Sequence, residues 1–280
     1  MKFFDFWSLK ESAFEENASP KFFYESTEHR EALDRLRYVI DSDNMNIGLL
    51  TGEIGAGKTM SRNVLKEELL RGKEHNFVVS LDTSDFRFID IMKEIVVQLT
   101  GLTYNDIPAN KYAVHSHLKQ FLKLEVIPQN KRVFIFFDEA QKIKPADLDA
   151  LKDLTNISFD YKAPITLIFI GQPDLLRTIK KLPQIDQRIS MRYHLNHMTK
   201  YDTMLYVKHR LEKAGCMENI ISQDAIDVIY SYTDGVPREI NRACRIALDY
   251  GFSEDIDVIT RDEILPVFKD IANQEKRMNV

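Results

Sequence analysis

The stretch that decides the fold is Gly52-Glu53-Ile54-Gly55-Ala56-Gly57-Lys58-Thr59. It fits the pattern G-x-x-x-x-G-K-[ST], in which a glycine-rich loop wraps around phosphate oxygens. Glycines allow the backbone to approach a phosphate closely, and the N–H groups at the start of the following helix attract negative charge. The pattern therefore predicts a site for a nucleoside triphosphate.

The residues on either side of this loop support the prediction. Before it, residues 46–51 form a short apolar run typical of a buried strand. After it, residues 60–70 place apolar side chains at helical spacing among charged ones. A strand, a glycine loop and a helix in this order form the expected phosphate-binding geometry. We expect Lys58 to reach the β- and γ-phosphates of ATP, Thr59 to bind Mg²⁺, and Met60 to lie beside the nucleotide.

Composition indicates a globular protein from a reducing compartment. The 280 residues are 44% hydrophobic and 10% aromatic, which is ample for a packed core. The two cysteines, Cys216 and Cys244, do not suggest a disulfide framework. No signal peptide and no apolar run long enough to span a membrane are apparent, so we expect a cytoplasmic location. A net charge of −5 argues against a protein coated in nucleic acid, although a local basic stripe stays compatible with it.

A second strong signal lies about 80 residues after the loop. Residues 133–137 are five consecutive large apolar residues, as expected for a strand covered on both faces of a parallel sheet. Asp138 and Glu139 follow it, at the edge where open α/β sheets bind ligands. Asp138 is expected to hold Mg²⁺, directly or through water. Glu139 is expected to act as the general base for the water that attacks the γ-phosphate.

Three further strands complete the predicted sheet. Residues 77–82, 164–173, which end in the polar residue Gln172 and Pro173, and 191–195 are expected as strands between helical segments. Gln172 lies at the end of the second of them, and we expect it at the same sheet edge, either facing the γ-phosphate or bonding the turn. The fold class is therefore α/β, a doubly wound, five-stranded parallel core.

The character of the chain changes near residue 198, after which only helical patterns occur. Ser222 is a predicted N-cap, and Thr260 and Glu263 form a capping-box pattern. We expect an aromatic lead-in over residues 1–26 that packs on the core, a nucleotide-binding domain over 27–197 and an all-α lid domain over 198–280. Alternatively, one or two aromatic side chains of the lead-in are expected to line the edge of an adenine pocket, together with neighbours near His29.

In combination, these features resemble the AAA+ ATPases. The lead-in FWSLKESAF…SPKFFYESTEHREAL, the segments IGQPDL and QIDQRISMRYHL, and GVPREINR resemble more narrowly the ExeA/GspA-type ATPases and the related TnsC-, TniB- and MuB-like transposition regulators. The resemblance covers residues 3–270. It implies a homo-oligomer, a ring or a helical filament, with ATP at the subunit interfaces.

The resemblance also assigns roles to residues that match it. Arg238, in the GVPREINR segment, matches the lid arginine that senses the γ-phosphate in its own subunit. Gln172 matches the sensor position on the fourth strand. Arg188 is the first choice for the arginine that reaches a neighbouring subunit's nucleotide, and Arg192 the second. An arginine supplied in this way stabilises charge on the transferred phosphoryl group, so hydrolysis would depend on assembly.

Three hypotheses for the function follow, two that differ in the partner of the ATPase and one without ATP hydrolysis. The first hypothesis is a transposition regulator that polymerises with ATP on duplex DNA and recruits a transposase or targeting protein, with Lys111, Lys119 and Lys123 facing the DNA. Such lysines more usually form a solvated helix face. The second is an ATPase of a secretion or pilus apparatus. The polar end of the chain, where secretion members of the family continue into a membrane span, favours the first. The third is a nucleotide switch that does not hydrolyse ATP.

Overall fold

The computed structural model describes residues 2–15, 19–72, 76–82 and 87–278, and side-chain placement within them to residue 271. The chain divides into two compact units. We call one the α/β unit, which comprises Glu31–Ile54 and Lys58–Leu195. The other, the helical unit, comprises Met1–Arg30, Gly55–Gly57 and Asn196–Val280. The middle of the glycine loop, residues 55–57, is thus assigned to the helical unit, and the loop residues on either side of it to the α/β unit.

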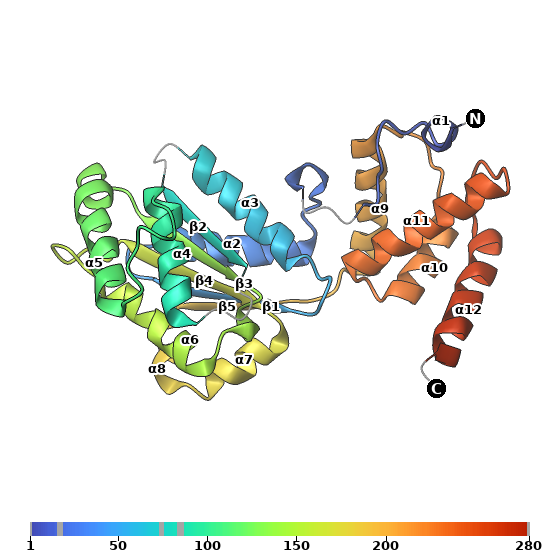
Figure 1. Cartoon of the computed structure of the whole chain (residues 1–280). Helices are drawn as coiled ribbons and strands as arrows, with labels where there is room; N and C mark the ends of the chain where they lie inside the picture. The colour runs from blue at the N-terminus through green and yellow to red at the C-terminus, as the bar shows by residue number, and fades with distance from the viewer. Residues whose placement is uncertain (1, 16–18, 73–75, 83–86, 279–280) are drawn as a thin grey trace. The chain divides into compact units, whose positions relative to one another are not determined.

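The α/β unit is built on a parallel sheet, shown in Figure 1. Its strands are β1 (Ile47–Gly52), β2 (Phe77–Asp82), β3 (Val133–Asp138), β4 (Ile165–Gly171) and β5 (Met191–Leu195). Within the described residues they lie in the order β2-β3-β4-β1-β5, and all neighbouring pairs are parallel. Every residue of β1, β3 and β4 is buried, which explains why these strands are continuous apolar runs.

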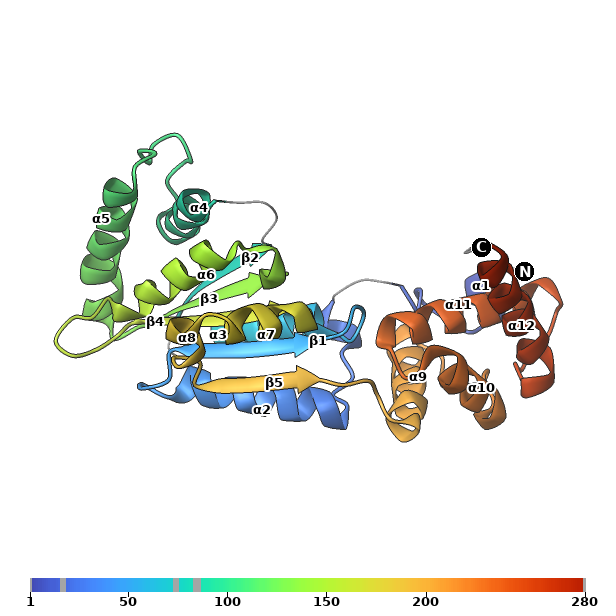
Figure 2. The same cartoon turned by 90° about the horizontal axis from the view of Figure 1, so that it is seen from below.

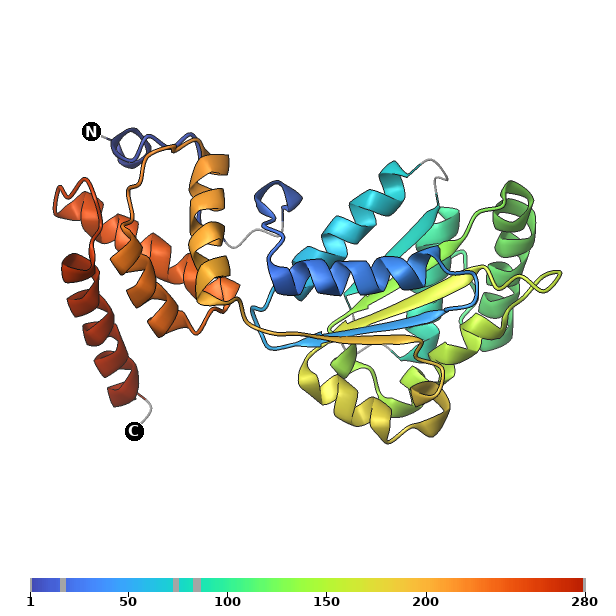
Figure 3. The same cartoon turned by 180° about the vertical axis from the view of Figure 1, so that it is seen from behind.

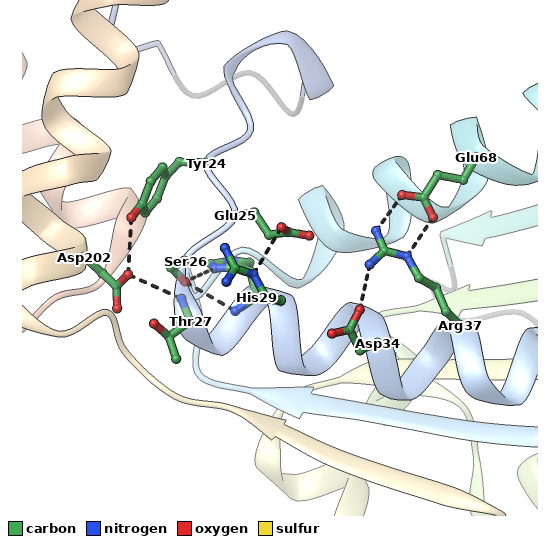
Figure 4. Close-up of polar contacts among 10 residues, drawn as sticks. Tyr24, Glu25, Ser26, Thr27, His29, Asp34, Arg37, Glu68 and Asp202 are labelled. Carbon is green, nitrogen blue, oxygen red and sulfur yellow. Dashed lines mark hydrogen bonds and ion pairs between the residues drawn. The ribbon is translucent and has the colours of Figure 1, made fainter.

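Helices cover both faces of this sheet. The helices of the unit are α2 (Thr27–Asp41, which begins in the helical unit), α3 (Lys58–Arg71), α4 (Phe88–Thr100), α5 (Lys111–Phe121), α6 (Pro145–Leu151), α7 (Pro173–Lys180) and α8 (Pro183–Asp186). Side chains of α4 to α8 share one hydrophobic core with alternate strand residues such as Leu49 and Ile135. Helices α2 and α3 lie together on the opposite face, as Figure 3 shows. An ion pair between Arg37 of α2 and Glu68 of α3, at 2.7 Å, joins them (Figure 4).

The observed architecture confirms the predicted fold class. Five parallel strands in the order 2-3-4-1-5, followed by helices, are the arrangement typical of the AAA+ fold. Because all strands run in the same direction, the carboxyl ends of β1, β3 and β4 lie at one edge of the sheet. The glycine loop begins at the last residue of β1, Asp138 is the last residue of β3, and Gln172 directly follows β4. The topology therefore gathers the predicted site residues of this unit at a single edge.

The helical unit packs four long helices, labelled in Figure 2, around a second hydrophobic core. These helices are α9 (Lys200–Ala214), α10 (Gln223–Thr233), α11 (Pro237–Ser253) and α12 (Arg261–Met278). The predicted caps form as expected: Ser222 Oγ accepts from the Ala225 N–H, and Glu263 accepts from the Thr260 N–H at 2.8 Å. No helix of the described residues is both long and apolar enough to cross a lipid bilayer.

The aromatic lead-in belongs to this second core. Trp7, Leu9, Phe14 and Phe22 are buried among residues of α9 to α11. The Trp7 indole N–H donates to the Leu248 carbonyl at 3.2 Å. The expectation that the lead-in packs on the core left open which core it joins, and these contacts lie in the core of the helical unit. The helices of this unit leave an apolar face that the rings cover, and an aromatic segment without periodicity does not reveal which core it joins.

Polar contacts extend this attachment toward α2. Tyr24 donates to Asp202 Oδ1 at 3.4 Å, and the Thr27 N–H donates to the same oxygen at 3.3 Å (Figure 4). Burial and the Asp202 carboxylate raise the pKa of Tyr24 to about 12, so its hydroxyl stays protonated and donates. The end of the lead-in and the start of α2 are therefore both held by α9 within the helical unit.

Candidate active site

The glycine loop connects the end of β1 to the start of α3. Lys58, the first residue of α3, is buried, and its ammonium group donates to the carbonyls of Gly52 at 2.8 Å and Glu53 at 2.7 Å. The lysine side chain thus bonds back to the start of its own loop, and its positive charge lies inside the loop. Of the other predicted loop residues, Ala56 is buried, Met60 is half-buried and Ile54 is exposed.

Thr59 and Asp138 meet although 79 residues separate them in the sequence. The Thr59 hydroxyl donates to Asp138 Oδ2 at 2.8 Å, and Asp138 Oδ1 accepts from the Glu139 N–H at 2.9 Å. Asp138 is only 3% exposed. A hydroxyl and a carboxylate side by side are the hard oxygen ligands that Mg²⁺ prefers, with phosphate oxygens and water completing its octahedron. These two residues therefore fit the predicted magnesium ion.

Glu139 follows the strand in a left-handed conformation, with φ of 52°. Its carboxylate accepts a hydrogen bond from Gln141 Nε2 at 2.8 Å and lies 3.7 Å from the Lys142 ammonium group. The same Gln141 side chain accepts from the Gln172 N–H at 3.0 Å through its Oε1. Gln141 therefore connects Glu139 to the end of β4, and the sequence analysis did not identify it. An amide two residues after the carboxylate pair was the available signal.

A second residue that the sequence analysis missed is Arg62, one turn after Thr59 in α3. Its guanidinium lies 3.1 Å from Asp138 Oδ2 and 2.5 Å from Asp82 Oδ1. The sequence around Arg62 does not reveal these contacts, because they depend on which strands lie beside the start of α3.

The remaining predicted residues of the α/β unit lie along the chain after β4. Gln172 is the N-cap residue of α7, and its backbone contact with Gln141 places it at the sheet edge. Arg188 is exposed and donates to Asn156 Oδ1 at 2.5 Å. Arg192 instead pairs with the Asp186 carboxylate at 2.8 Å within its own subunit. The sensor and arginine-finger roles stay predictions, and the intramolecular ion pair of Arg192 favours Arg188 for the latter.

Arg238 and the middle of the glycine loop belong together in the helical unit. The Arg238 N–H donates to the Gly55 carbonyl at 3.3 Å. Gly55 has φ of +82°, and a Cβ at this position would lie 2.8 Å from the Arg238 Cβ. Only glycine therefore allows α11 to begin this close to the loop. The contact brings the predicted lid arginine to the loop, while its role as a γ-phosphate sensor stays a prediction.

His29 supports the same part of the loop from α2. Its Nδ1 lies 2.7 Å from Ser26 Oγ (Figure 4), and a Cβ on Gly57 would lie 2.4 Å from its Nε2. Burial lowers the pKa of His29 from its ordinary 6.5 to about 4, against a smaller opposing effect of a hydrogen bond with the Ala56 backbone. A backbone partner that favours the protonated ring is a carbonyl, so the ring donates to the Ala56 carbonyl.

This environment predicts how stability depends on pH. Because the folded pKa lies below the unfolded one, the contribution of His29 is fully present above about pH 6.5 and is lost as the pH falls toward 4. A shift of this size corresponds to about 3 kcal/mol. We expect His29→Gln, whose amide does not titrate, to flatten the pH dependence of the thermal unfolding midpoint over this range. The matched variant His197→Gln should keep the wild-type slope, and a steep slope in His29→Gln would contradict the assignment.

Comparisons with known proteins agree with this geometry. Residues 41–179 match the family described as an AAA domain. The chain is 31% identical over 264 residues to general secretion pathway protein A of Aeromonas hydrophila, covering 92% of this chain and 46% of that protein. It thus spans about half the length of that relative.

Solved structures show the same fold. The ORC2 protein of Aeropyrum pernix, determined as ADPNP–ADP complexes, superposes with a TM-score of 0.68 at 19% identity, covering 93% of this chain and 71% of that one. Cdc6p of Pyrobaculum aerophilum superposes with a TM-score of 0.68 at 18% identity, covering 89% and 67%. At this level of identity the likeness concerns the fold alone. Residues 41–179 thus match an AAA domain, and the strand order of the α/β unit is the one typical of the AAA+ fold.

Proposed function

We propose that this chain is a magnesium-dependent ATPase. The observation that carries the proposal is the 2.8 Å contact between Thr59 and Asp138, with Glu139 following directly. In this proposal Lys58 binds the β- and γ-phosphates, Thr59 and Asp138 hold Mg²⁺, and Glu139 takes a proton from the attacking water. The metal, when bound, neutralises phosphate charge. Gln141 positions Glu139 by its hydrogen bond.

The proposal includes assembly of several copies. Arg188 is exposed and its guanidinium contacts a neutral amide of Asn156, so it is available to a neighbouring subunit. Arg238 would respond to the γ-phosphate from the helical unit, and Gln172 would contact the phosphate or the water. In such an assembly ATP hydrolysis depends on the contact between subunits, because the finger arginine of one completes the site of another.

The partner favoured now is a protein of a secretion apparatus. The sequence analysis placed DNA transposition first, on an analogy between whole families. The relative named above is instead a general secretion pathway protein. The comparisons lend no support to transposition or to DNA binding, so the alternative moves ahead. A cytoplasmic location and a ring or filament stay part of this proposal.

The three lysines that the DNA hypothesis requires are exposed, but their surroundings do not distinguish a DNA-binding surface from an ordinary helix face. Lys111, Lys119 and Lys123 are exposed on α5 and the turn after it. The Lys111 ammonium group lies over the Phe88 ring at 4.8 Å, so its charge is partly engaged by its own unit. This arrangement is typical of a solvated helix face.

One experiment separates the three hypotheses. Phosphate release by the purified chain is measured with Mg²⁺, with EDTA, and with added duplex DNA, and DNA retention is measured with ATP at low and high salt. We expect hydrolysis that requires Mg²⁺ and is indifferent to DNA. ATP binding without phosphate release would establish the nucleotide switch instead. Salt-sensitive DNA retention that is lost when the three lysines are replaced by glutamate would restore the DNA hypothesis.

A further inference from the structure

Arg62 shares one carboxylate oxygen with the candidate magnesium site. Its Nη1 lies 3.1 Å from Asp138 Oδ2, and the Thr59 hydroxyl donates to this same oxygen at 2.8 Å. The other oxygen of Asp138 accepts from the Glu139 N–H. The guanidinium therefore interacts with the oxygen that faces Thr59, where a metal ion bound by that hydroxyl would also interact.

Burial makes this contact strong. The side chain of Arg62 is 11% exposed and that of Asp138 is 4% exposed, so water screens their attraction little. Arginine cannot lose its proton at any physiological pH, and it therefore stays a permanent cation beside the carboxylate. A magnesium ion that approaches Asp138 Oδ2 meets both the repulsion of this cation and its competition for the same oxygen.

The strand next to Asp138 supplies a second place for the guanidinium. Asp82, the last residue of β2, is paired in register with Asp138. Its Oδ1 is 2.5 Å from Arg62 Nη1, and its side chain is 83% exposed. The two carboxylates thus flank one guanidinium, one of them buried at the metal site and the other exposed outside it. A small movement of Arg62 toward Asp82 would release Asp138 without leaving the cation unpaired.

We propose that Arg62 competes with magnesium for Asp138 and is taken up by Asp82 when the metal–nucleotide complex binds. Arg62 is then a positioning residue that sets how strongly the site prefers nucleotide with Mg²⁺ over nucleotide without it. The inference rests on the proposed function, since it requires that the loop bind nucleotide. It predicts that the loss of Arg62 and the loss of Asp82 change the magnesium preference in opposite directions.

The test measures binding and not turnover. The affinity of the purified full chain for ADP is determined by calorimetry with Mg²⁺ and with EDTA, and the ratio of the two dissociation constants is compared among variants. Removing the competing cation in Arg62→Gln should raise the magnesium preference about tenfold. In Asp82→Asn the guanidinium keeps only Asp138 as a charged partner of the pair, and the preference should fall several-fold.

Two controls distinguish this proposal from other roles of the arginine. Arg71→Gln removes an exposed arginine of the same helix, paired with Glu67 at 2.9 Å, and should leave the ratio unchanged. Arg62→Lys keeps the charge in a weaker geometry and should lie between wild type and Arg62→Gln. Because Asp82→Asn changes an exposed carboxylate, it tests the proposal even where loss of Arg62 impairs folding.

The opposing outcomes are distinct. Equal weakening of ADP binding with and without Mg²⁺ in Arg62→Gln would make Arg62 a phosphate ligand and overturn the proposal. An unchanged ratio in Arg62→Gln and Asp82→Asn would reduce the cluster to a structural ion pair. A wild-type chain that binds no ADP under either condition would instead refute the proposed function, and this inference with it.

Discussion

Replacing Lys58 with alanine is expected to lower the affinity for ATP by at least about a hundredfold, which corresponds to roughly 3 kcal/mol. The lysine is buried and its ammonium group lies between the carbonyls of Gly52 and Glu53, at 2.8 and 2.7 Å. A phosphate bound in this loop would receive a charge-assisted hydrogen bond from the same group. Titration of the purified variant with a fluorescent ATP analogue measures the loss directly.

The matched control for this variant is Lys66→Ala, which removes a half-buried lysine two turns further along α3. It should bind the analogue like the wild type. Because Lys58 also holds two loop carbonyls, a circular dichroism melt is needed to show that the variant is folded. Wild-type affinity in a folded Lys58→Ala protein would show that the glycine loop is not the phosphate site, and the roles of Thr59 and Asp138 would lose their basis.

The order and the ends of the strands show how far the sequence leads. β1, β3 and β4 are buried on both faces and had to be apolar runs, which made them recognisable. The edge strands β2 and β5 are only partly buried, yet they begin and end where they were predicted. The order of the strands depends on which edges pair, and no single run of residues encodes it. The AAA+ resemblance identified the family to which that order belongs.

Local irregularities were harder to predict. The sequence of residues 112–124 predicts a single helix, but the α-helix ends at Phe121 and the chain continues as a π-helical turn over Leu122–Val126. Leu122 and Val126 are both buried, and the wider turn turns both toward the core before Pro128. Periodicity detects the apolar stripe but not a change of pitch within it. The sequence also predicts a helix from about Phe86 to Leu99, and the start of this prediction lies outside the described residues.

The site divides in the same way. Thr59 and Asp138 could be predicted because each sits in a motif whose chemistry requires the other. Gln141 offered only an amide close to the carboxylate pair as a signal, and Arg62 offered none, since their roles arise from where β3 places its end relative to β4 and β2. The domain limits at residues 26 and 197 stay predictions. The compact units divide the chain differently, because residues 55–57 of the loop belong with the N-terminal segment and the last helices.

Glu139→Gln is expected to reduce ATP hydrolysis by about 10²- to 10⁴-fold, the usual contribution of a positioned general base. An amide cannot take a proton from the attacking water, yet it has nearly the same shape as the carboxylate. Its carbonyl oxygen can still accept from Gln141 Nε2, which now lies 2.8 Å from Glu139 Oε2. ATP binding should therefore be retained, and the ATP-bound assembly should persist. Phosphate release and size-exclusion chromatography with ATP measure the two effects.

Two further variants establish whether the loss is chemical. Glu67→Gln removes an exposed carboxylate of α3 that pairs with Arg71, and it should hydrolyse ATP like the wild type. Gln141→Ala leaves Glu139 in place but removes the hydrogen bond that orients it, so a smaller loss, about tenfold, is expected. Because Gln141 also accepts from the Gln172 N–H, its loss should loosen both strand ends at the sheet edge. If Glu139→Gln turned over ATP at the wild-type rate, the base would have to be another residue, and the division of labour between Asp138 and Glu139 would be wrong.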